Sequence, residues 1–313
     1  MSNWRPSSSV AVAVRRAELL QRTRDYFARN DVLAVDTPSL SPSAPTDPNI
    51  HALSVHDSDF YLHTSPEFHM KRLLAGAFPD IYSICRVFRA AEQGRYHLPE
   101  FTMVEWYRHS MDLTAIIADT LQLVITVLER PLLLDDIYER DYTTLFKEIV
   151  DLDPLEASVD ELASIVSADD SLRSSLGAHR DAWLDLILAT IIVPRFDDDG
   201  LTVIRHYPAS QASLARFCPE DIRVADRFEV YFGKLELANG YVELTDADEL
   251  ARRMDADLQA RRAGGLPIIP RDEALLSAHE AGLPDCAGVA LGFERLQMID
   301  ANTDDIRNVV SFA

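Results

Sequence analysis

Apolar residues recur at helical spacing in three parts of the chain. Leu19–Leu20 and Tyr26–Phe27 lie two helical turns apart and predict a helix over about residues 10–30. A second stretch carries a stripe of apolar residues at intervals of four, three and four, which is typical of a helix that buries one face: Ile117, Leu121, Val124 and Leu128. The apolar run at 181–193 predicts a third helix, which we expect to end at Pro194.

Alternating apolar and polar residues predict strands over 80–90 and 101–108, joined as a long hairpin. Further strands are expected at 32–37, 201–207, 227–238 and 288–291. The Ser- and Pro-rich segment 39–49 predicts a loop. Ser65-Pro66-Glu67 predicts the start of another helix, with Ser65 as the N-cap. Strands that pair over long hairpins, with helices between groups of strands, favour an α+β fold with an antiparallel sheet flanked by helices.

Composition adds limits on the class of protein. We expect one domain over 1–313, because no linker or repeat divides the chain, with a small helical insertion at about 138–180. Thirty basic and 51 acidic residues give a net charge of −21, which opposes general binding to nucleic acid or simply keeps the surface soluble. Three widely spaced cysteines and the lack of a signal peptide or membrane span predict a cytoplasmic protein with reduced thiols.

The predicted hairpin carries the first candidate chemistry. Alternation turns Phe101, Met103, Glu105 and Tyr107 to one face of the second strand. An acid on a face with Met and an aromatic ring needs a cationic or donor partner. The alternative is a surface hairpin with a charged, solvated rim.

Two further clusters lie in the C-terminal third. Glu236 and Glu243 flank Asn239-Gly240, a tight-turn signal, and paired acids of this kind can bind Mg²⁺ or a cationic substrate, or remain solvated. Gly292 and Arg295 stand where a predicted strand meets a helix. Glycine permits close approach of a nucleotide and arginine binds phosphate as a fork, although an ordinary surface arginine is the alternative.

Together, and in chain order, these segments resemble class II aminoacyl-tRNA synthetases of the lysyl type. The matching segments are Val32–Pro38 for motif 1, Ser65-Pro66-Glu67 for substrate binding, Phe88–Met103 for motif 2, Glu236–Gly240 for the lysyl-specific stretch and Gly292–Arg295 for motif 3. Within that family the chain is most similar to free-standing lysyl-tRNA synthetase paralogues that modify elongation factor P. That similarity lies in Gly94–His97, Glu105–Tyr107, Tyr207–Leu214 and Gly288–Gly292, where Ala290 replaces a glycine of true lysyl-tRNA synthetases.

The resemblance implies ATP-dependent activation of (R)-β-lysine, or lysine, as an adenylate and transfer to a lysine side chain of elongation factor P. It implies catalytic roles for Arg89 at the α-phosphate and Arg295 at the γ-phosphate, Mg²⁺ at Glu236 and Glu243, and a homodimer. The residues implied in amino-acid binding are Ser65, Pro66, Glu67, Tyr107, Glu243 and Ala290. Those implied in ATP binding are Arg89, Ala90, Ala91, Glu92, His97, Leu98, Phe101, Glu236, Leu237, Gly292 and Arg295.

Two positions depart from the family's pattern. Ala91 stands where motif 2 has an acid, so either Glu92 substitutes for it or the backbone contacts the nucleotide. Leu98 replaces an asparagine, so one nucleotide contact is expected to be lost. The alternatives are a truncated lysyl-tRNA synthetase that charges tRNA and a non-catalytic regulatory paralogue. We expect no anticodon-binding domain, no tRNA partner and no membrane association.

Overall fold

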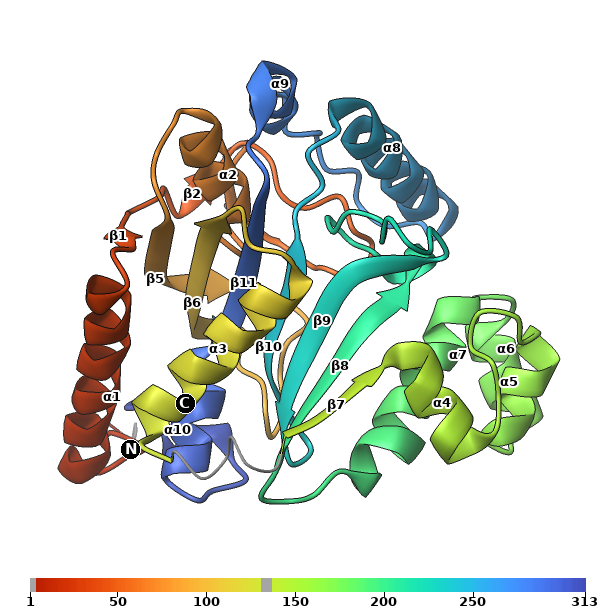
Figure 1. Ribbon diagram of the computed structural model, residues 1–313, viewed down its shortest axis with the longest axis horizontal. Coiled ribbons are helices and arrows are strands. Elements are labelled where there is room, and N and C mark those ends of the chain that lie inside the picture. The colour runs from red at the N-terminus through yellow and green to blue at the C-terminus, as the bar shows by residue number, and fades with distance from the viewer. Residues whose placement is uncertain (1–3, 131–136) are drawn as a thin grey trace. The chain divides into compact units, whose positions relative to one another are not determined.

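The computed structural model describes residues 4–130 and 137–313. These residues form two compact units: the first contains the described residues up to 130 together with 242–313, and the second contains 137–241 (Figure 1). The second unit includes the predicted insertion at 138–180. A single domain over 1–313 therefore stays a prediction, and each unit is described by itself.

The sheet of the first unit has the strand order β1 (Leu33–Ala34), β5 (Ile81–Phe88), β6 (Glu100–His109) and β11 (Cys286–Gly292). β1 is parallel to β5, and the other pairs are antiparallel. The β5–β6 pair confirms the predicted hairpin. A small second sheet has the order β2 (Leu40–Ser41), β4 (Tyr61–Leu62) and β3 (Leu53–Ser54), so the predicted loop at 39–49 contains one short strand.

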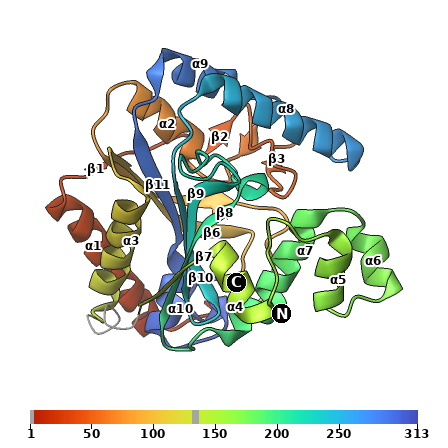
Figure 2. The ribbon, with the colours of Figure 1, turned by 45° about the vertical axis from the view of Figure 1, so that its right-hand side comes forward.

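Helices of the first unit pack in two groups. α1 (Val10–Arg29), α3 (Leu113–Leu128) and α10 (Phe293–Asp300) lie together along the sheet, and α2 (Glu67–Ala75) and α8 (Ala247–Ala263) each pack against α9 (Glu273–Gly282) (Figure 2). The predicted helices at 10–30 and around the apolar stripe are confirmed. Their first turns are capped by Ser9, which accepts from Val12 N–H, and by Asp112, which accepts from Ala115 N–H.

Asp119 is an acid in the apolar helix α3. Its carboxylate accepts hydrogen bonds from the Tyr26 hydroxyl at 2.6 Å and from Trp106 Nε1 at 3.0 Å. Buried polar groups are tolerated when they are paired in this way. The acid therefore joins α1, α3 and β6, and explains how an ionisable residue fits a helix with a largely buried surface.

The second unit has, within its described residues, four strands and a core of its own. Its strand order is β10 (Leu235–Val242), β9 (Val224–Phe232), β8 (Leu201–Pro208) and β7 (Ile137–Asp141), antiparallel except for the parallel β7–β8 pair. The helices are α4 (Tyr142–Val150), α5 (Val159–Ile165), α6 (Asp170–Leu176) and α7 (Arg180–Ile187). Short helices within 138–180 are thus confirmed. Their apolar side chains form one core with residues of β8 and β9.

One sequence prediction in this unit is wrong. The tight turn expected at Asn239-Gly240 is absent, because both residues pair with β9 inside strand β10. The turn lies at Gly233-Lys234, where Gly233 has φ of +54° and an added Cβ would lie 2.7 Å from the carbonyl oxygen of Asp198. The helix expected over 181–193 is confirmed, although its α-helical part ends at Ile187 and it continues as a π turn, Leu188–Ile192, and a 3₁₀ turn that contains Pro194. Proline lacks an N–H, so regular α bonding cannot pass through it.

Cys85, Cys218 and Cys286 are free thiols; the last two are buried and Cys85 is half-buried. Among the described residues, no helix combines the length and apolar character needed to cross a membrane.

Candidate active site

One face of the first unit's sheet carries a carboxylate among small residues. β6 pairs Tyr107 with Gly288 and Glu105 with Ala290 on β11, and Glu105 also pairs with Ser83 on β5. Directly opposed residues of an antiparallel pair lie on the same face. Small side chains on both sides of Glu105 therefore leave room above its carboxylate.

Glu105 is only 2% exposed and has two hydroxyl donors. Ser65 Oγ donates at 2.6 Å and the Tyr107 hydroxyl donates at 2.8 Å, which confirms that this acid has the partners its position demands. Burial, reinforced by the neighbouring Glu67 carboxylate, raises the pKa of Glu105 to about 7. The carboxyl group is therefore able to change charge near neutral pH when a cation arrives.

Ser65 has a different local role from the one predicted. Pro66, not Ser65, occupies the N-cap position of α2. Ser65 Oγ still accepts from Glu67 N–H at 3.0 Å, while its own proton goes to Glu105. The serine thus connects the start of α2 to the carboxylate on β6.

A buried ammonium group lies next to this carboxylate. Lys71 Nζ is 2.7 Å from Glu67 Oε1 and 2.5 Å from Glu243 Oε2, and the lysine is 1% exposed. Burial disfavours its charged form, but the Glu243 and Glu67 carboxylates outweigh burial and raise the pKa of Lys71. The site therefore already holds one cation between two acids, a pairing that buried charges require.

Gly288 allows the side chains of this cluster to close over β11. A Cβ atom added at Gly288 would lie 2.5 Å from Glu243 Oε1 and 2.5 Å from Tyr107 Cε1. Contacts this short do not occur, so the absence of a side chain is a packing requirement. The glycine is needed for space and not for an unusual backbone angle, since its φ lies outside the left-handed region.

A small cavity of about 20 Å³ opens beside this cluster. Its lining includes Ser43, His63, Thr64, Ser65 and Glu67. His63 Nδ1 and Thr64 Oγ1 are buried without a hydrogen-bond partner among the described residues. Burial lowers the pKa of His63, so the ring is neutral. Its Nε2 donates to the Arg86 carbonyl oxygen at 2.6 Å, so Nδ1 can accept one further hydrogen bond.

The two candidate phosphate-binding arginines are linked through Glu92 and His97. Arg89 Nη1 lies 3.4 Å from Glu92 Oε1, and its guanidinium lies 5.3 Å from the centre of the Phe101 ring. Glu92 Oε2 lies 3.2 Å from His97 Nε2, which in turn lies 2.6 Å from Arg295 Nη2. Because an arginine only donates, His97 Nε2 is the acceptor in that bond, and the Glu92 carboxylate is a close neighbour of this nitrogen without a hydrogen bond to it.

The loop geometry explains the position of Glu92. β5 ends at Phe88, so strand alternation no longer governs the residues after Arg89. Ala90 N–H bonds to the carbonyl oxygen of His51 at 2.8 Å, and Glu92 N–H bonds to the carbonyl oxygen of Arg89 at 3.3 Å. The chain therefore turns back and points the Glu92 carboxylate towards Arg89.

Arg295 is positioned by the residue before it. Glu294, 1% exposed, accepts from Thr102 N–H at 2.8 Å and from Arg16 Nη2 at 2.8 Å. These bonds fix the first turn of α10 against β6 and α1. Gly292 is the N-cap of α10, and an added Cβ there would meet only the flexible Arg295 side chain, at 3.6 Å.

Comparison with known proteins identifies the family. A sequence profile of the family described as tRNA synthetases class II (D, K and N) matches residues 2–313. The chain belongs to this class II synthetase family. Three curated relatives are named elongation factor P–(R)-β-lysine ligase. That of Edwardsiella ictaluri is 41% identical over 322 residues, covering 100% of this chain and 98% of the relative. Those of Photorhabdus laumondii and Proteus mirabilis are 40% and 41% identical over 321 and 324 residues, again covering 100% of this chain and 98% of each relative.

The class II synthetase assignment confirms the predicted fold family. The first unit brings together two groups of predicted site residues: Ser65, Glu67, Tyr107, Glu243 and Ala290 around the carboxylates, and Arg89, Glu92, His97, Phe101 and Arg295 at the arginines. Pro66 begins α2, Ala91 and Leu98 lie in the β5–β6 loop, and Gly292 ends β11. Glu236 and Leu237 lie on β10 in the second unit, Glu236 half-buried and Leu237 buried.

Sequence reasoning missed three residues of this candidate site. Glu105 was recognised as an acid in need of a partner but was not assigned to substrate binding. Lys71 had a local signal, because it follows Glu67 by four residues, the spacing of a helical ion pair. Gly288 lies in a segment that resembles the family, but its packing role could not be predicted, since that requirement arises only when Tyr107 and Glu243 meet over it.

Proposed function

We propose that this protein is an ATP-dependent ligase that activates (R)-β-lysine as an adenylate and transfers it to a lysine side chain of elongation factor P. The names of the relatives give the acceptor and the amino acid. The buried carboxylate cluster is the observation in this chain that carries the proposal.

The charges of that cluster match a substrate with two ammonium groups. When ionised, Glu67, Glu105 and Glu243 contribute −3 and Lys71 contributes +1, which leaves −2. A lysine or β-lysine molecule brings two ammonium groups, so it would neutralise the site. An aliphatic or acidic amino acid would leave buried negative charge unpaired, which is costly. The site is therefore suited to diamino acids.

Arginines supply the complementary charge for ATP. In the proposed first step, an oxygen of the amino-acid carboxylate attacks the α-phosphorus, and pyrophosphate leaves. Arg89 would contact the α-phosphate and Arg295 the γ-phosphate, each stabilising negative charge that develops during transfer. Glu92 and His97, which now contact these arginines, would give way to the phosphates.

Magnesium would be held by Glu236, whose hard carboxylate oxygens suit this ion. Glu243 fits that role less well, because its Oε2 lies 2.5 Å from the Lys71 ammonium. We therefore assign Glu243 to recognition of ammonium groups. The ion, when bound with ATP, supplies positive charge to the phosphates.

In the second step, a neutral lysine amine of elongation factor P attacks the adenylate carbonyl carbon and AMP leaves. No enzyme nucleophile is required, because positioning and charge stabilisation carry the reaction. The proposal also includes a homodimer formed through the segment 32–38 and a location in the cytoplasm.

A transfer assay tests the proposal. Purified protein, ATP and Mg²⁺ are incubated with (R)-β-lysine or α-lysine, and elongation factor P and tRNA are offered as separate acceptors. Pyrophosphate exchange measures the first step and intact-mass spectrometry measures the second. The expected result is exchange that depends on the diamino acid, followed by one added β-lysyl group on elongation factor P.

Other results have distinct meanings. Charging of tRNA in place of elongation factor P would identify a minimal lysyl-tRNA synthetase. Failure of pyrophosphate exchange with every amino acid would identify a non-catalytic paralogue. Glu100→Gln is a matched control for Glu105→Gln, since both acids lie on β6 but the Glu100 side chain is 54% exposed. Loss of exchange in the Glu105 variant alone would locate the substrate at the buried cluster.

A further inference from the structure

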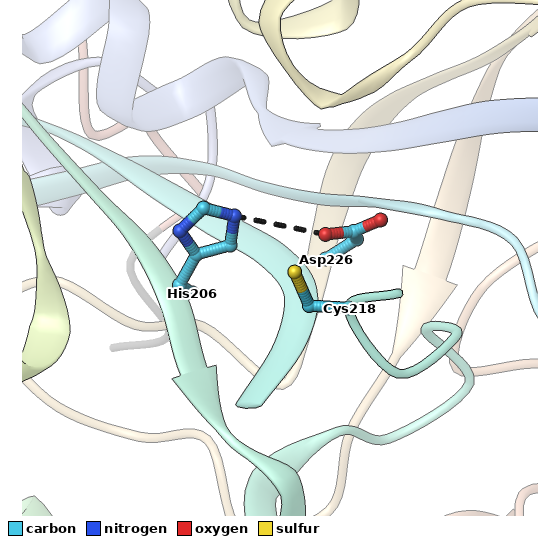
Figure 3. A group of neighbouring side chains, drawn as sticks. All are labelled: His206, Cys218 and Asp226. Atoms are coloured by element: carbon cyan, nitrogen blue, oxygen red, sulfur yellow. Dashed lines mark ion pairs between the residues drawn. The ribbon is translucent and has the colours of Figure 1, made fainter. Parts of the chain in front are cut away.

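A group of three potential metal ligands lies in the second unit, separate from the residues assigned to catalysis. His206, Cys218 and Asp226 each offer one ligand atom, and these atoms lie within 4.8 Å of one another (Figure 3). His206 comes from β8, Asp226 from β9, and Cys218 from the loop that precedes β9. Cys218 and Asp226 are 5% and 4% exposed.

Strand pairing aims His206 at this group. Arg205 pairs with Phe228 and Tyr207 with Ala225, so the single residue His206 faces two residues of β9. Such a bulge redirects a side chain. His206 also has φ of +55°, an uncommon angle for a residue with a side chain. Backbone strain of this kind persists where the surrounding structure holds it and often marks a functional position.

Hydrogen bonding leaves the inward-facing nitrogen of His206 available. Its Nδ1 lies 2.8 Å from Asp141 Oδ1, so a proton on Nδ1 is donated to that carboxylate. Nε2 then carries a lone pair. It lies 3.6 Å from Asp226 Oδ1, which is too far for a hydrogen bond. A carboxylate that fixes the outer nitrogen of a histidine is the usual second partner of a metal-binding histidine.

The distance between His206 Nε2 and Asp226 Oδ1 is close to that expected around a small tetrahedral ion. Nitrogen and oxygen ligands each about 2.0–2.1 Å from a zinc ion are about 3.3 Å apart in a tetrahedron. The Nε2–Oδ1 separation of 3.6 Å requires only a slight contraction. Arg216 Nε holds Asp226 Oδ2 at 2.8 Å, which leaves Oδ1 directed at His206.

We propose that His206 Nε2, Cys218 Sγ and Asp226 Oδ1 form a binding site for a divalent zinc-like cation. Thiolate, imidazole and carboxylate together favour zinc over magnesium or calcium, which prefer oxygen alone. Without the ion, the Cys218 thiol donates its proton to Glu220 Oε2 at 3.1 Å. The ion takes the place of this proton, which is released to solvent. His206 is partly exposed, 26% for its side chain, so the ion has a route of entry.

The surrounding charges also suit a dication. The negative groups are the Asp141, Asp226 and Glu220 carboxylates, the Cys218 thiolate and the Glu139 carboxylate, and the positive groups in contact with them are Arg205 and Arg216. The acidic groups outnumber the two arginines, so a bound dication offsets excess negative charge.

Zinc binding to the whole protein tests the site. Chelator-treated protein is titrated with Zn²⁺ alone, without ATP, and bound metal is measured by calorimetry and elemental mass spectrometry. Wild type and Cys85→Ser, a thiol variant in the first unit, should bind one Zn²⁺ per chain at this site. Cys218→Ser should weaken binding by more than about 100-fold, because a direct ligand is lost.

Two further measurements on wild-type protein do not depend on the folding of a variant. Co²⁺ should produce thiolate-to-cobalt charge-transfer absorption. Zn²⁺ should slow alkylation of Cys218 but not of Cys85, as followed by peptide mass spectrometry. No Zn²⁺ binding by wild type, equal binding by Cys218→Ser, or a cobalt spectrum without a thiolate band would each overturn the proposal.

Discussion

Gly288→Ala tests whether the cluster of Glu67, Glu105, Glu243 and Lys71 depends on the absence of a side chain at position 288 of β11. The new Cβ would lie 2.5 Å from Tyr107 Cε1 and from Glu243 Oε1, so both side chains must move by about 1 Å to reach ordinary van der Waals contact. Tyr107 is only 3% exposed, so its ring must move against packed neighbours. Overpacking of this kind destabilises a protein by about 1–3 kcal/mol.

The same movement affects substrate binding. The Tyr107 hydroxyl donates to Glu105 at 2.8 Å, and Glu243 contacts Lys71 at 2.5 Å. Weakening one hydrogen bond to a charged group costs about 1.5–3 kcal/mol, or roughly 10- to 150-fold in affinity. We therefore expect the KM for the amino acid in pyrophosphate exchange to rise by that factor, with less change in the KM for ATP.

Gly292→Ala is the matched control on the same strand. Its Cβ would meet only the Arg295 side chain at 3.6 Å, and the backbone there has φ of −77°. Urea unfolding should show a change within about 0.5 kcal/mol for this variant. Equal stability of Gly288→Ala and Gly292→Ala, together with an unchanged amino-acid KM, would refute the packing argument.

Four further predictions concern charge and selectivity, all measured by pyrophosphate exchange. Glu105→Gln should raise the KM for (R)-β-lysine about 10- to 150-fold, whereas Glu100→Gln should not. Because an ammonium group binds the ionised carboxylate and the pKa of Glu105 is about 7, the wild-type KM should fall as pH rises through 7; a flat profile would contradict this assignment. Arg295→Ala should lower kcat by about 100- to 1000-fold, as expected when a group that stabilises transition-state charge is removed. Ala290→Gly should shift preference towards α-lysine, and unchanged selectivity would show that Ala290 does not set it.

Local patterns predicted the parts of the fold that depend on neighbours in sequence. The β5–β6 hairpin and the strand–glycine–helix junction at Gly292 follow from residue alternation and one breaker. Asn239-Gly240 is a local turn signal, but the prediction of a turn there was wrong. Both residues pair with β9 inside strand β10, so the strand pairing overrides the local preference. The true turn, at Gly233, depends on the approach of Asp198, a contact between distant residues.

The candidate site shows the same division. Motif residues such as Arg89 and Arg295 could be predicted, but the route that links them through Glu92 and His97 could not. Lys71 is held between Glu67, one turn away, and Glu243, far along the chain. Only the folded first unit shows that two acids and an internal ammonium group share one buried place.

The short segment between β4 and α2 contacts both Arg89, in the arginine group, and Glu105, in the carboxylate cluster. The Thr64 carbonyl oxygen accepts from Arg89 Nε at 3.4 Å, while the next residue, Ser65, donates to Glu105 at 2.6 Å. Phe88 N–H bonds to the carbonyl oxygen of His63 at 3.0 Å, so this segment is held along the end of β5. Adjacent residues therefore fix the arginine expected at the α-phosphate relative to the carboxylate expected at an ammonium group. Because adenylate formation requires the amino-acid carboxylate to meet the α-phosphorus, we propose that the hydrogen bonds of residues 63–65 help to set the geometry of the reaction.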